Sequence, residues 1–250
     1  MDGTLRTEIN HSASHVFKLP SNLPVELGAL IEPLAVALHA HGRAKLSVGA
    51  TVLVLGGGAI GLLVAAVGRS RGLSVVVADL LEERVRFATR HGFADKGVVV
   101  PTLPEAKCVD EKLQASQDLA EQIAEAHLSG TEDGKVGEVD AVFECTGSES
   151  ALQSAIYSCK PGGKVLMIGM GHAVQTLPIA AAATREVDLL GVFRYAGTYA
   201  DAVGLAGSGD PSLPDLTRLV THKVNGVDNV EEAFRLSGTE GCIKAAFYWD

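Results

Sequence analysis

The chain has 250 residues, of which 47% are hydrophobic and 20% charged, and its net charge at pH 7 is −9. This length and apolar content allow one large or two small folded domains with a proper core, and they exclude an intrinsically disordered chain. The acidic balance and the lack of any basic run argue against nucleic acid and anionic membrane surfaces as partners.

An apolar stretch at residues 29–40 is interrupted by an acid–proline pair, Glu32 and Pro33. A carboxylate in such a stretch costs free energy unless a partner satisfies it, so Glu32 is a candidate functional residue. A carboxylate at a helix start, directly ahead of a proline, is the alternative interpretation and stays open. The first 44 residues contain no clear strand–helix–strand unit.

From residue 45 onward, short strand-like runs alternate with helical patterns. Strands are expected at residues 51–55, 73–79, 97–100, 139–147, 162–171 and 184–195. Helices are expected at residues 59–72, 80–92, around 119–126, and at 148–159, with Ser148 as N-cap. Residues from 101 to about 114 are expected to form a surface insertion. The alternation predicts an α/β fold, a doubly wound parallel sheet that binds ligands at the carboxyl ends of its strands.

The run GGGAIG after the first expected strand fits the spacing G-x-G-x-x-G at Gly56, Gly58 and Gly61. In this pattern the first glycine permits a tight turn, the second lets the backbone approach a pyrophosphate, and the third lets helix and strand pack closely. The next helix offers free N–H groups to phosphates. Asp79 closes the second strand 18 residues after Gly61 and can accept hydrogen bonds from both ribose hydroxyls, so NAD is favoured over NADP.

Alternatives to an NAD site stay open at this point. Arg84 lies one turn into the next helix, where it could stack on adenine or pair with Asp79, and it keeps NADP as an alternative. The glycines could form only a turn in a nucleotide-free α/β domain, and Asp79 could cap a helix. Methyltransferases also combine a glycine-rich first loop with an acid on the second strand.

Six motifs follow one another in the chain: EPL, GGGAIG, ECTG, KPGGKVLMIGMG, REVDLLGVFRY and LVTHKV. As a set they resemble the zinc-dependent medium-chain dehydrogenases, in particular the branch of sorbitol, xylitol and L-arabinitol dehydrogenases. The resemblance implies an NAD-binding Rossmann domain at residues 45–195, flanked by parts of a GroES-like catalytic domain at residues 1–44 and 196–250. It implies hydride transfer from a CH–OH group of an alcohol or polyol to NAD, with a zinc ion that lowers the pKa of the alcohol.

The resemblance also assigns roles to individual residues. Glu32 matches a glutamate beside the zinc, Arg194 matches a residue of the polyol pocket, and Tyr195 is its neighbour. Asp79 and Arg84 match contacts to the adenosine ribose. Cofactor positions are matched by Gly56, Gly58, Ile60, Gly61, Cys145, Thr146, Gly147, Ile168, Gly169, Met170, Phe193 and Arg194. A purely structural Arg194 in an interdomain salt bridge stays open, and Cys145 and Cys159 are interpreted as small buried hydrophobic residues.

The chain departs from the family at the zinc ligands. The family takes them from a cysteine and a Gly-His-Glu motif, whereas no Gly-His-Glu occurs here and no cysteine precedes Cys108. Catalytic zinc requires three protein ligands and an open position, and Glu32 supplies at most one. Four histidines are interpreted as surface or interdomain residues rather than ligands: His11, His15, His39 and His41.

We therefore expect a truncated NAD-dependent dehydrogenase that does not bind zinc by itself and is weakly active or inactive alone. The alternative is a non-catalytic dinucleotide-binding module or a regulatory fragment. Far-separated cysteines without a CxxC pair indicate a reducing, cytoplasmic compartment, and no secretory leader or membrane span is expected. The resemblance implies a homo-oligomer. Four apolar side chains are expected to be exposed: Val16, Phe17, Phe234 and Phe247.

Overall fold

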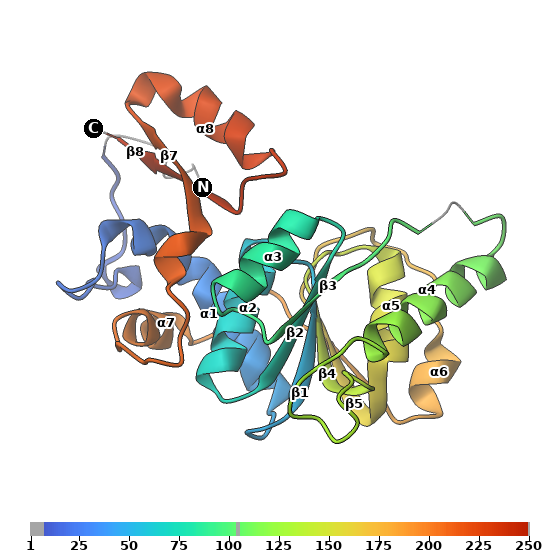
Figure 1. Ribbon diagram of the computed structural model, residues 1–250. Helices are drawn as coiled ribbons and strands as arrows, with labels where there is room; N and C mark the ends of the chain where they lie inside the picture. Colours follow the sequence, from blue (N-terminus) through green and yellow to red (C-terminus); the bar gives the residue numbers. More distant parts are fainter. Residues whose placement is uncertain (1–7, 104–105, 250) are drawn as a thin grey trace.

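The computed structural model describes residues 8–103 and 106–249, and its centre is a six-stranded parallel sheet between two layers of helices (Figure 1). The strands are β1 (Thr51–Leu55), β2 (Ser74–Asp79), β3 (Lys96–Val99), β4 (Val139–Glu144), β5 (Cys159–Met167) and β6 (Asp188–Gly191). Their order across the sheet is β3-β2-β1-β4-β5-β6, so the direction of winding reverses between β1 and β4. The predicted doubly wound α/β fold is confirmed.

The central strands are continuous apolar runs because helices cover both of their faces. In β1 and β2 every residue after the first is buried. Both strands are rich in valine, whose branched side chain packs well on a pleated surface. Burying one such side chain contributes roughly 2 kcal/mol, so these two strands hold much of the hydrophobic driving force.

Two hydrophobic clusters lie on the two sides of the sheet. One side is covered by α1 (Gly28–Ala44), α2 (Ala59–Ser70) and α3 (Glu82–Arg90), and α7 (Tyr199–Ala206) packs on the outside of α1. The other is covered by α4 (Val109–Ala124), α5 (Glu149–Ser158) and α6 (Ile179–Ala183). Neighbouring strand residues such as Val54 and Leu55 belong to different clusters, so each strand joins the two layers.

The predicted elements differ from the structure at two places. Residues up to about 114 were expected to form a surface insertion, but α4 already begins at Val109. Only one face of α4 is buried, around Leu119 and Ile123, so its polar first turns look like a loop in the sequence. The last strand, β6, is also shorter than expected. Ser148 is the predicted N-cap of α5, since its Oγ accepts the N–H of Ala151 at 3.1 Å.

His41 corrects the interpretation of the histidines. It is 2% exposed, its Nε2 lies 2.9 Å from the carbonyl oxygen of Val64, and its ring centroid lies 4.6 Å from that of Phe143. It is therefore a core residue that joins α1 to α2 and β4, and the prediction of a surface or interdomain residue is wrong for it. His11 and His15 are exposed, as expected.

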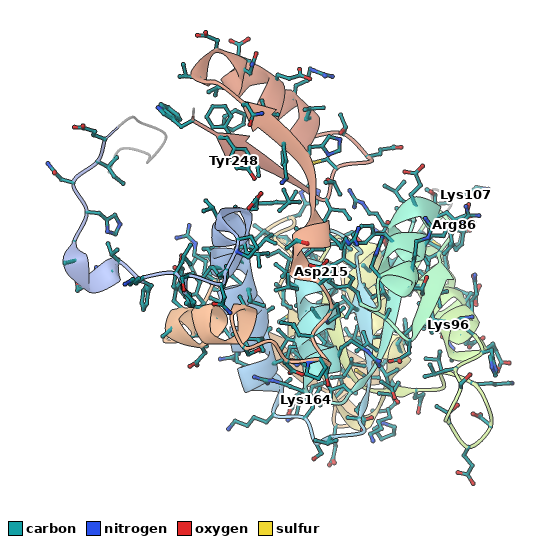
Figure 2. The ribbon with its side chains drawn as sticks, turned by 60° about the vertical axis from the view of Figure 1, so that its left-hand side comes forward. Arg86, Lys96, Lys107, Lys164, Asp215 and Tyr248 are labelled. Carbon is teal, nitrogen blue, oxygen red and sulfur yellow. The ribbon has the colours of Figure 1, made fainter. Side chains whose placement is uncertain are left out.

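The chain after α7 forms a small lobe beside the sheet (Figure 1). The lobe contains η4 (Val227–Asn229), α8 (Val230–Ser237) and a parallel pair of strands, β7 (Val220–Asn225) and β8 (Lys244–Tyr248). It is joined to the body by η3 (Leu216–Leu219), whose two leucines are buried in the cluster formed with α1 and α2. Figure 2 shows Tyr248 in this lobe and Lys164 at the far end of the molecule. Two short helices precede α1, η1 (Ala13–His15) and η2 (Val25–Leu27), and Glu26 of η2 pairs with Lys223 of β7 at 2.8 Å.

Apolar side chains are exposed on both flanking segments. Val16, Phe17 and Phe234 are exposed, as predicted, although Phe17 stacks on Tyr199. The prediction is wrong for Phe247, which is half-buried and packs edge-on against Trp249. Among the described residues, no helix is long and apolar enough to cross a membrane.

Candidate functional site

The glycine motif forms a tight turn between β1 and α2, and two of its three glycines, Gly56 and Gly61, are sterically required. Gly56 has a φ of +101°, and a β-carbon on it would lie 2.9 Å from Cγ2 of Thr146. A β-carbon on Gly61 would lie 1.8 Å from the carbonyl oxygen of Gly56, so only hydrogen fits there. Gly58 is the N-cap of α2, and Ile60 lies in the first turn. The turn therefore leaves the N–H groups at the start of α2 accessible to an anion.

Asp79, at the carboxyl end of β2, is fixed beside this turn. Its side chain is 9% exposed, Oδ2 accepts the N–H of Gly57 at 2.6 Å, and Oδ1 accepts the N–H of Leu81 at 2.8 Å. The N-cap of α3 is Leu81, so the alternative interpretation of Asp79 as the cap is wrong, although its carboxylate does satisfy one N–H there. Nη1 of Arg84 lies 3.8 Å from Oδ2, which is the predicted pairing of these two residues.

A cavity of about 700 Å³ opens at the carboxyl ends of β1 to β4, a size that suits a small organic ligand. Six predicted cofactor residues line it: Gly56, Gly58, Asp79, Arg84, Cys145 and Thr146. The sequence interpretation missed the rest of the wall. It is made by Leu55, by Ala78, Leu80 and Leu81, by Val100 to Leu103 after β3, by Leu119 of α4, and by Ser148, Ser150, Ala151 and Ser154 around α5. The expectation that ligands bind at the carboxyl ends of the strands was the signal for the loop after β3, because β3 adjoins β2 in the sheet.

Three independent features of the cavity match the three kinds of group in a dinucleotide. Aliphatic walls suit a planar base, Asp79 suits ribose hydroxyls, and the start of α2 suits phosphates. Among the described residues, five buried side-chain polar atoms lack a hydrogen-bond partner, and two of them, Arg84 Nε and Ser154 Oγ, belong to residues that line this cavity. A buried polar atom without a partner costs free energy, so a polar ligand would relieve it.

The loop after β4 is held by a buried carboxylate that the sequence interpretation missed. Glu144 is 2% exposed and accepts the N–H groups of Thr146 at 2.7 Å and Gly147 at 2.9 Å, together with the Thr146 hydroxyl. Its place in the ECTG motif was the available signal. Burial, and then the charge of Glu144, raises the pKa of the Cys145 thiol well above its usual range, so this thiol is unreactive at neutral pH.

The loops after β4 and β5, which contain Gly147 and the run from Ile168 to Met170, lie against each other. A β-carbon on Gly169 would lie 2.0 Å from the backbone nitrogen of Gly147. Ile168 packs on the core, whereas Met170 is exposed. Phe193 follows β6 and is also exposed, with the Arg194 guanidinium 5.4 Å from its ring centroid. Neither Phe193 nor Arg194 lines the cavity.

The predicted catalytic residues are Glu32, Arg194 and Tyr195, and the structure groups only some of them. Glu32 is exposed and lies inside α1, four residues after its first residue, so the helix-start interpretation is wrong. Burial, then Tyr195 and Glu32, raises the pKa of the Tyr199 hydroxyl, and the Tyr195 and Tyr199 rings lie 5.7 Å apart. Tyr199 therefore belongs to the same group of side chains as Glu32 and Tyr195, and the sequence interpretation missed it. In the described part of the chain Arg194 forms no ion pair, with Glu32 or otherwise.

Comparison with known proteins decides the family. Residues 59–208 match the family model described as zinc-binding dehydrogenase. This chain belongs to the zinc-binding dehydrogenase family. Sorbitol dehydrogenase of Arabidopsis thaliana is 35% identical to it over 98% of this chain and 62% of that protein. L-idonate 5-dehydrogenase of Vitis vinifera is 33% identical, again over 98% and 62%. The chain thus spans about 62% of the length of these relatives.

Solved structures agree with this assignment. 2R,3R-butanediol dehydrogenase from Bacillus subtilis is 27% identical, with a TM-score of 0.73 over 92% of this chain and 60% of that chain. A protein from Sinorhizobium meliloti, described as a zinc-binding dehydrogenase and bound to NADP, is 25% identical, with a TM-score of 0.75 over 92% and 61%. The predicted resemblance to zinc-type polyol dehydrogenases is confirmed.

The described residues of this chain do not fit a catalytic zinc ion by themselves. Residues 8–103 and 106–249 contain no group of three or more His, Cys, Asp or Glu side chains that could hold a metal. Glu32 is a single acid, and Nε2 of His41 is occupied by the carbonyl oxygen of Val64. No reaction step through zinc follows from these residues.

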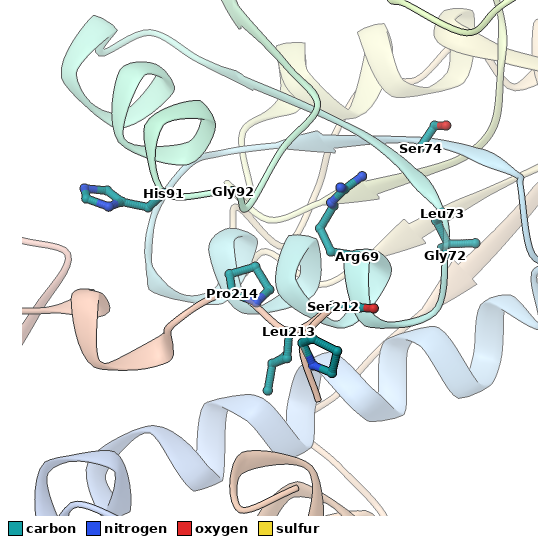
Figure 3. Close-up of a pocket in the computed structure, with 10 residues that line it drawn as sticks. Arg69, Gly72, Leu73, Ser74, His91, Gly92, Ser212, Leu213 and Pro214 are labelled. Atoms are coloured by element: carbon teal, nitrogen blue, oxygen red, sulfur yellow. The ribbon is translucent and has the colours of Figure 1, made fainter. Parts of the chain in front are cut away.

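A second hollow, of about 640 Å³, lies at the opposite end of β2 (Figure 3). It lies just beyond the carboxyl ends of α2 and α3, near Gly72 and Gly92, where the helix dipole is negative. Its one arginine, Arg69, already pairs with Asp95. The hollow therefore lacks the features that bind phosphate, and the cavity beside Asp79 remains the candidate site.

Proposed function

We propose that this dehydrogenase binds NAD in the cavity beside Asp79 and serves the oxidation of a CH–OH group of a polyol or another secondary alcohol. The single observation that supports the NAD half most strongly is the fixed carboxylate of Asp79 at the cavity wall. A carboxylate there accepts ribose hydroxyls and repels a 2′-phosphate. Arg84, whose Nε has no hydrogen-bond partner among the described residues, is the feature that favours NADP as the alternative.

Each part of the site has its own task in this proposal. The N–H groups at the start of α2 bind the pyrophosphate, and Asp79 orients the adenosine ribose. Gly147 and Gly169 let the loops after β4 and β5 pack closely, because a β-carbon on either would collide with the backbone of the other loop. These two loops are the proposed wall of the nicotinamide end. NAD, when bound, accepts the hydride. The protein therefore contributes binding and orientation, which are its part in cofactor chemistry.

The substrate side is proposed from the relatives. Their names point to sorbitol, L-idonate and butanediol, which share a secondary CH–OH group. Glu32, Tyr195 and Arg194 are the proposed residues near the alcohol. Because the described residues do not fit zinc, we propose that the 250-residue chain alone binds NAD but oxidises polyols weakly or not at all.

Calorimetry and turnover assays test these proposals separately. The 250-residue protein is titrated with NAD and with NADP, and tighter binding of NAD is expected. NADH formation is then followed with sorbitol, xylitol and 2,3-butanediol, with and without added zinc. Binding without turnover is expected both from the proposal and from a non-catalytic binding module. A longer form of the protein that carries zinc ligands distinguishes the two, because it gains activity only if the proposal is right. Robust turnover by the chain alone would contradict the proposed inactivity, and tighter NADP binding would overturn the assignment of NAD.

A further inference from the structure

The wall that α5 contributes to the cavity carries one unsatisfied hydroxyl. Ser154 is fully buried and lines the cavity, and its Oγ has no hydrogen-bond partner among the described residues. The neighbouring side chain in the helix has hydrogen-bond partners for both its oxygen and its nitrogen. Gln153 accepts a hydrogen bond from the Ser116 hydroxyl at 2.8 Å and donates one to the carbonyl oxygen of Thr176 at 2.7 Å. Ser154 is thus the exception on a helix turn whose other polar side chain is paired.

The surroundings of Ser154 suit a flat aromatic ring. Leu103, Leu119 and Ala151 line the same cavity with aliphatic surface, whereas Asp79 and the glycine turn supply its polar and anion-binding parts. With phosphates at the turn and ribose at Asp79, the part of a dinucleotide left for the aliphatic wall is the base. A purine has apolar faces and polar edges, and a serine hydroxyl can both donate to and accept from such an edge.

We propose that the hydroxyl of Ser154 binds the polar edge of the adenine base, which makes Ser154 a specificity-determining residue of the cofactor site. The inference rests on the proposed dinucleotide function. In the free protein the hydroxyl is desolvated and unpaired, which costs free energy. Binding of adenine supplies the missing partner, so this hydrogen bond adds to affinity without any competing bond being broken in the protein.

Ser158 provides a matched control on the same helix. It lies one turn after Ser154, is 4% exposed, and its Oγ also lacks a partner within the described residues, but it does not line the cavity. Ser154→Ala and Ser158→Ala therefore remove the same group from nearly the same environment. Only the first removes it from the cavity wall.

Calorimetric titrations of both variants and the wild type with NAD, ADP-ribose and nicotinamide mononucleotide test the proposal. Ser154→Ala is expected to weaken NAD and ADP-ribose by about 3- to 10-fold, the value of one neutral hydrogen bond, and to leave nicotinamide mononucleotide unchanged. Ser158→Ala is expected to leave all three unchanged. Thermal melts of the free proteins check that both variants fold.

Two results overturn the proposal while leaving the proposed function intact. The first is wild-type affinity of Ser154→Ala for NAD and ADP-ribose. The second is an equal loss in Ser158→Ala, which would assign the effect to packing of α5. If the wild type binds neither NAD nor ADP-ribose, the proposed function fails and the role of Ser154 fails with it.

Discussion

The body, which is the six-stranded sheet with its covering helices, and the β7–β8 lobe are both built from parallel strands and helices. They differ in the fraction of their residues that is buried. Four of the five residues of β1 are buried, against one of the six in β7, and α8 has no buried residue. Every residue that lines the candidate cofactor cavity lies between Leu55 and Ser154, within the body. Cofactor binding should therefore depend on the body alone, while the lobe contributes little to it.

The substitution with the largest expected effect is Gly61→Ala, at the centre of the body's site. The new β-carbon would lie 1.8 Å from the carbonyl oxygen of Gly56, so the turn or the helix must move. We expect a loss of about 3 kcal/mol in the free energy of unfolding and no measurable NAD binding. Urea denaturation and calorimetry measure the two effects.

Gly204→Ala, in α7, is the matched control, since a β-carbon there meets nothing within 4 Å. It should stabilise the protein by about 0.5–1 kcal/mol through helix propensity. Normal NAD binding by Gly61→Ala would show that close packing of the turn is not required.

His41 makes the stability of the body depend on pH. Burial lowers the pKa of its imidazole from 6.5 to about 4, so protonation favours the unfolded chain. Its contribution is fully present above pH 6.5 and is lost as the pH falls from 6.5 to about 4. Over that range we expect a loss of roughly 3 kcal/mol in the free energy of unfolding.

Urea denaturation of the wild type and of His41→Gln at pH 7.5 and pH 5 isolates this effect from other titrating groups. The variant should be less stable at pH 7.5 but should lose less stability on acidification. Equal pH dependence of the two proteins would mean that His41 is not the titrating group.

Asp79→Asn comes next in size. An amide keeps the shape of the side chain but removes the charge that strengthens hydrogen bonds to ribose hydroxyls and repels a 2′-phosphate. We expect NAD affinity to fall by about 10- to 100-fold and the preference over NADP to shrink. Calorimetric titration with both cofactors measures the change.

Asp140→Asn is its control, because Oδ2 of Asp140 accepts the N–H of Thr51 at 2.8 Å but does not line the cavity. It should leave both affinities unchanged. An equal loss in the two variants would attribute the effect to the sheet rather than to the cofactor.

These residues differ in how much of their role the sequence contains. The turn at Gly56 and the acid Asp79 were predicted because glycine spacing and strand ends are local patterns. The burial of His41 was not, since it depends on Val64 and Phe143, which lie far away in the chain. The cavity wall at Ser154 was missed for the same reason. Helical periodicity predicts which face of α5 points inward, but the packing of the helices decides which of the inward residues line the cavity.

The smallest expected effect concerns the contact between the segment before α1 and the lobe. The hydrogen bond to Lys223 lowers the pKa of Glu26 to about 2, so the pair contributes above pH 4.5 and is lost as the pH falls from 4.5 to about 2. The pair is open to solvent, and exposed ion pairs stabilise proteins little. Glu26→Gln should leave the melting temperature and NAD affinity unchanged, while amide hydrogen exchange in β7 becomes faster. Glu232→Gln, which breaks a pair confined to α8, is the control and should leave exchange in β7 unchanged. If Glu26→Gln instead lowers the melting temperature of the whole protein, the lobe and the body unfold as one unit and the contrast between them disappears.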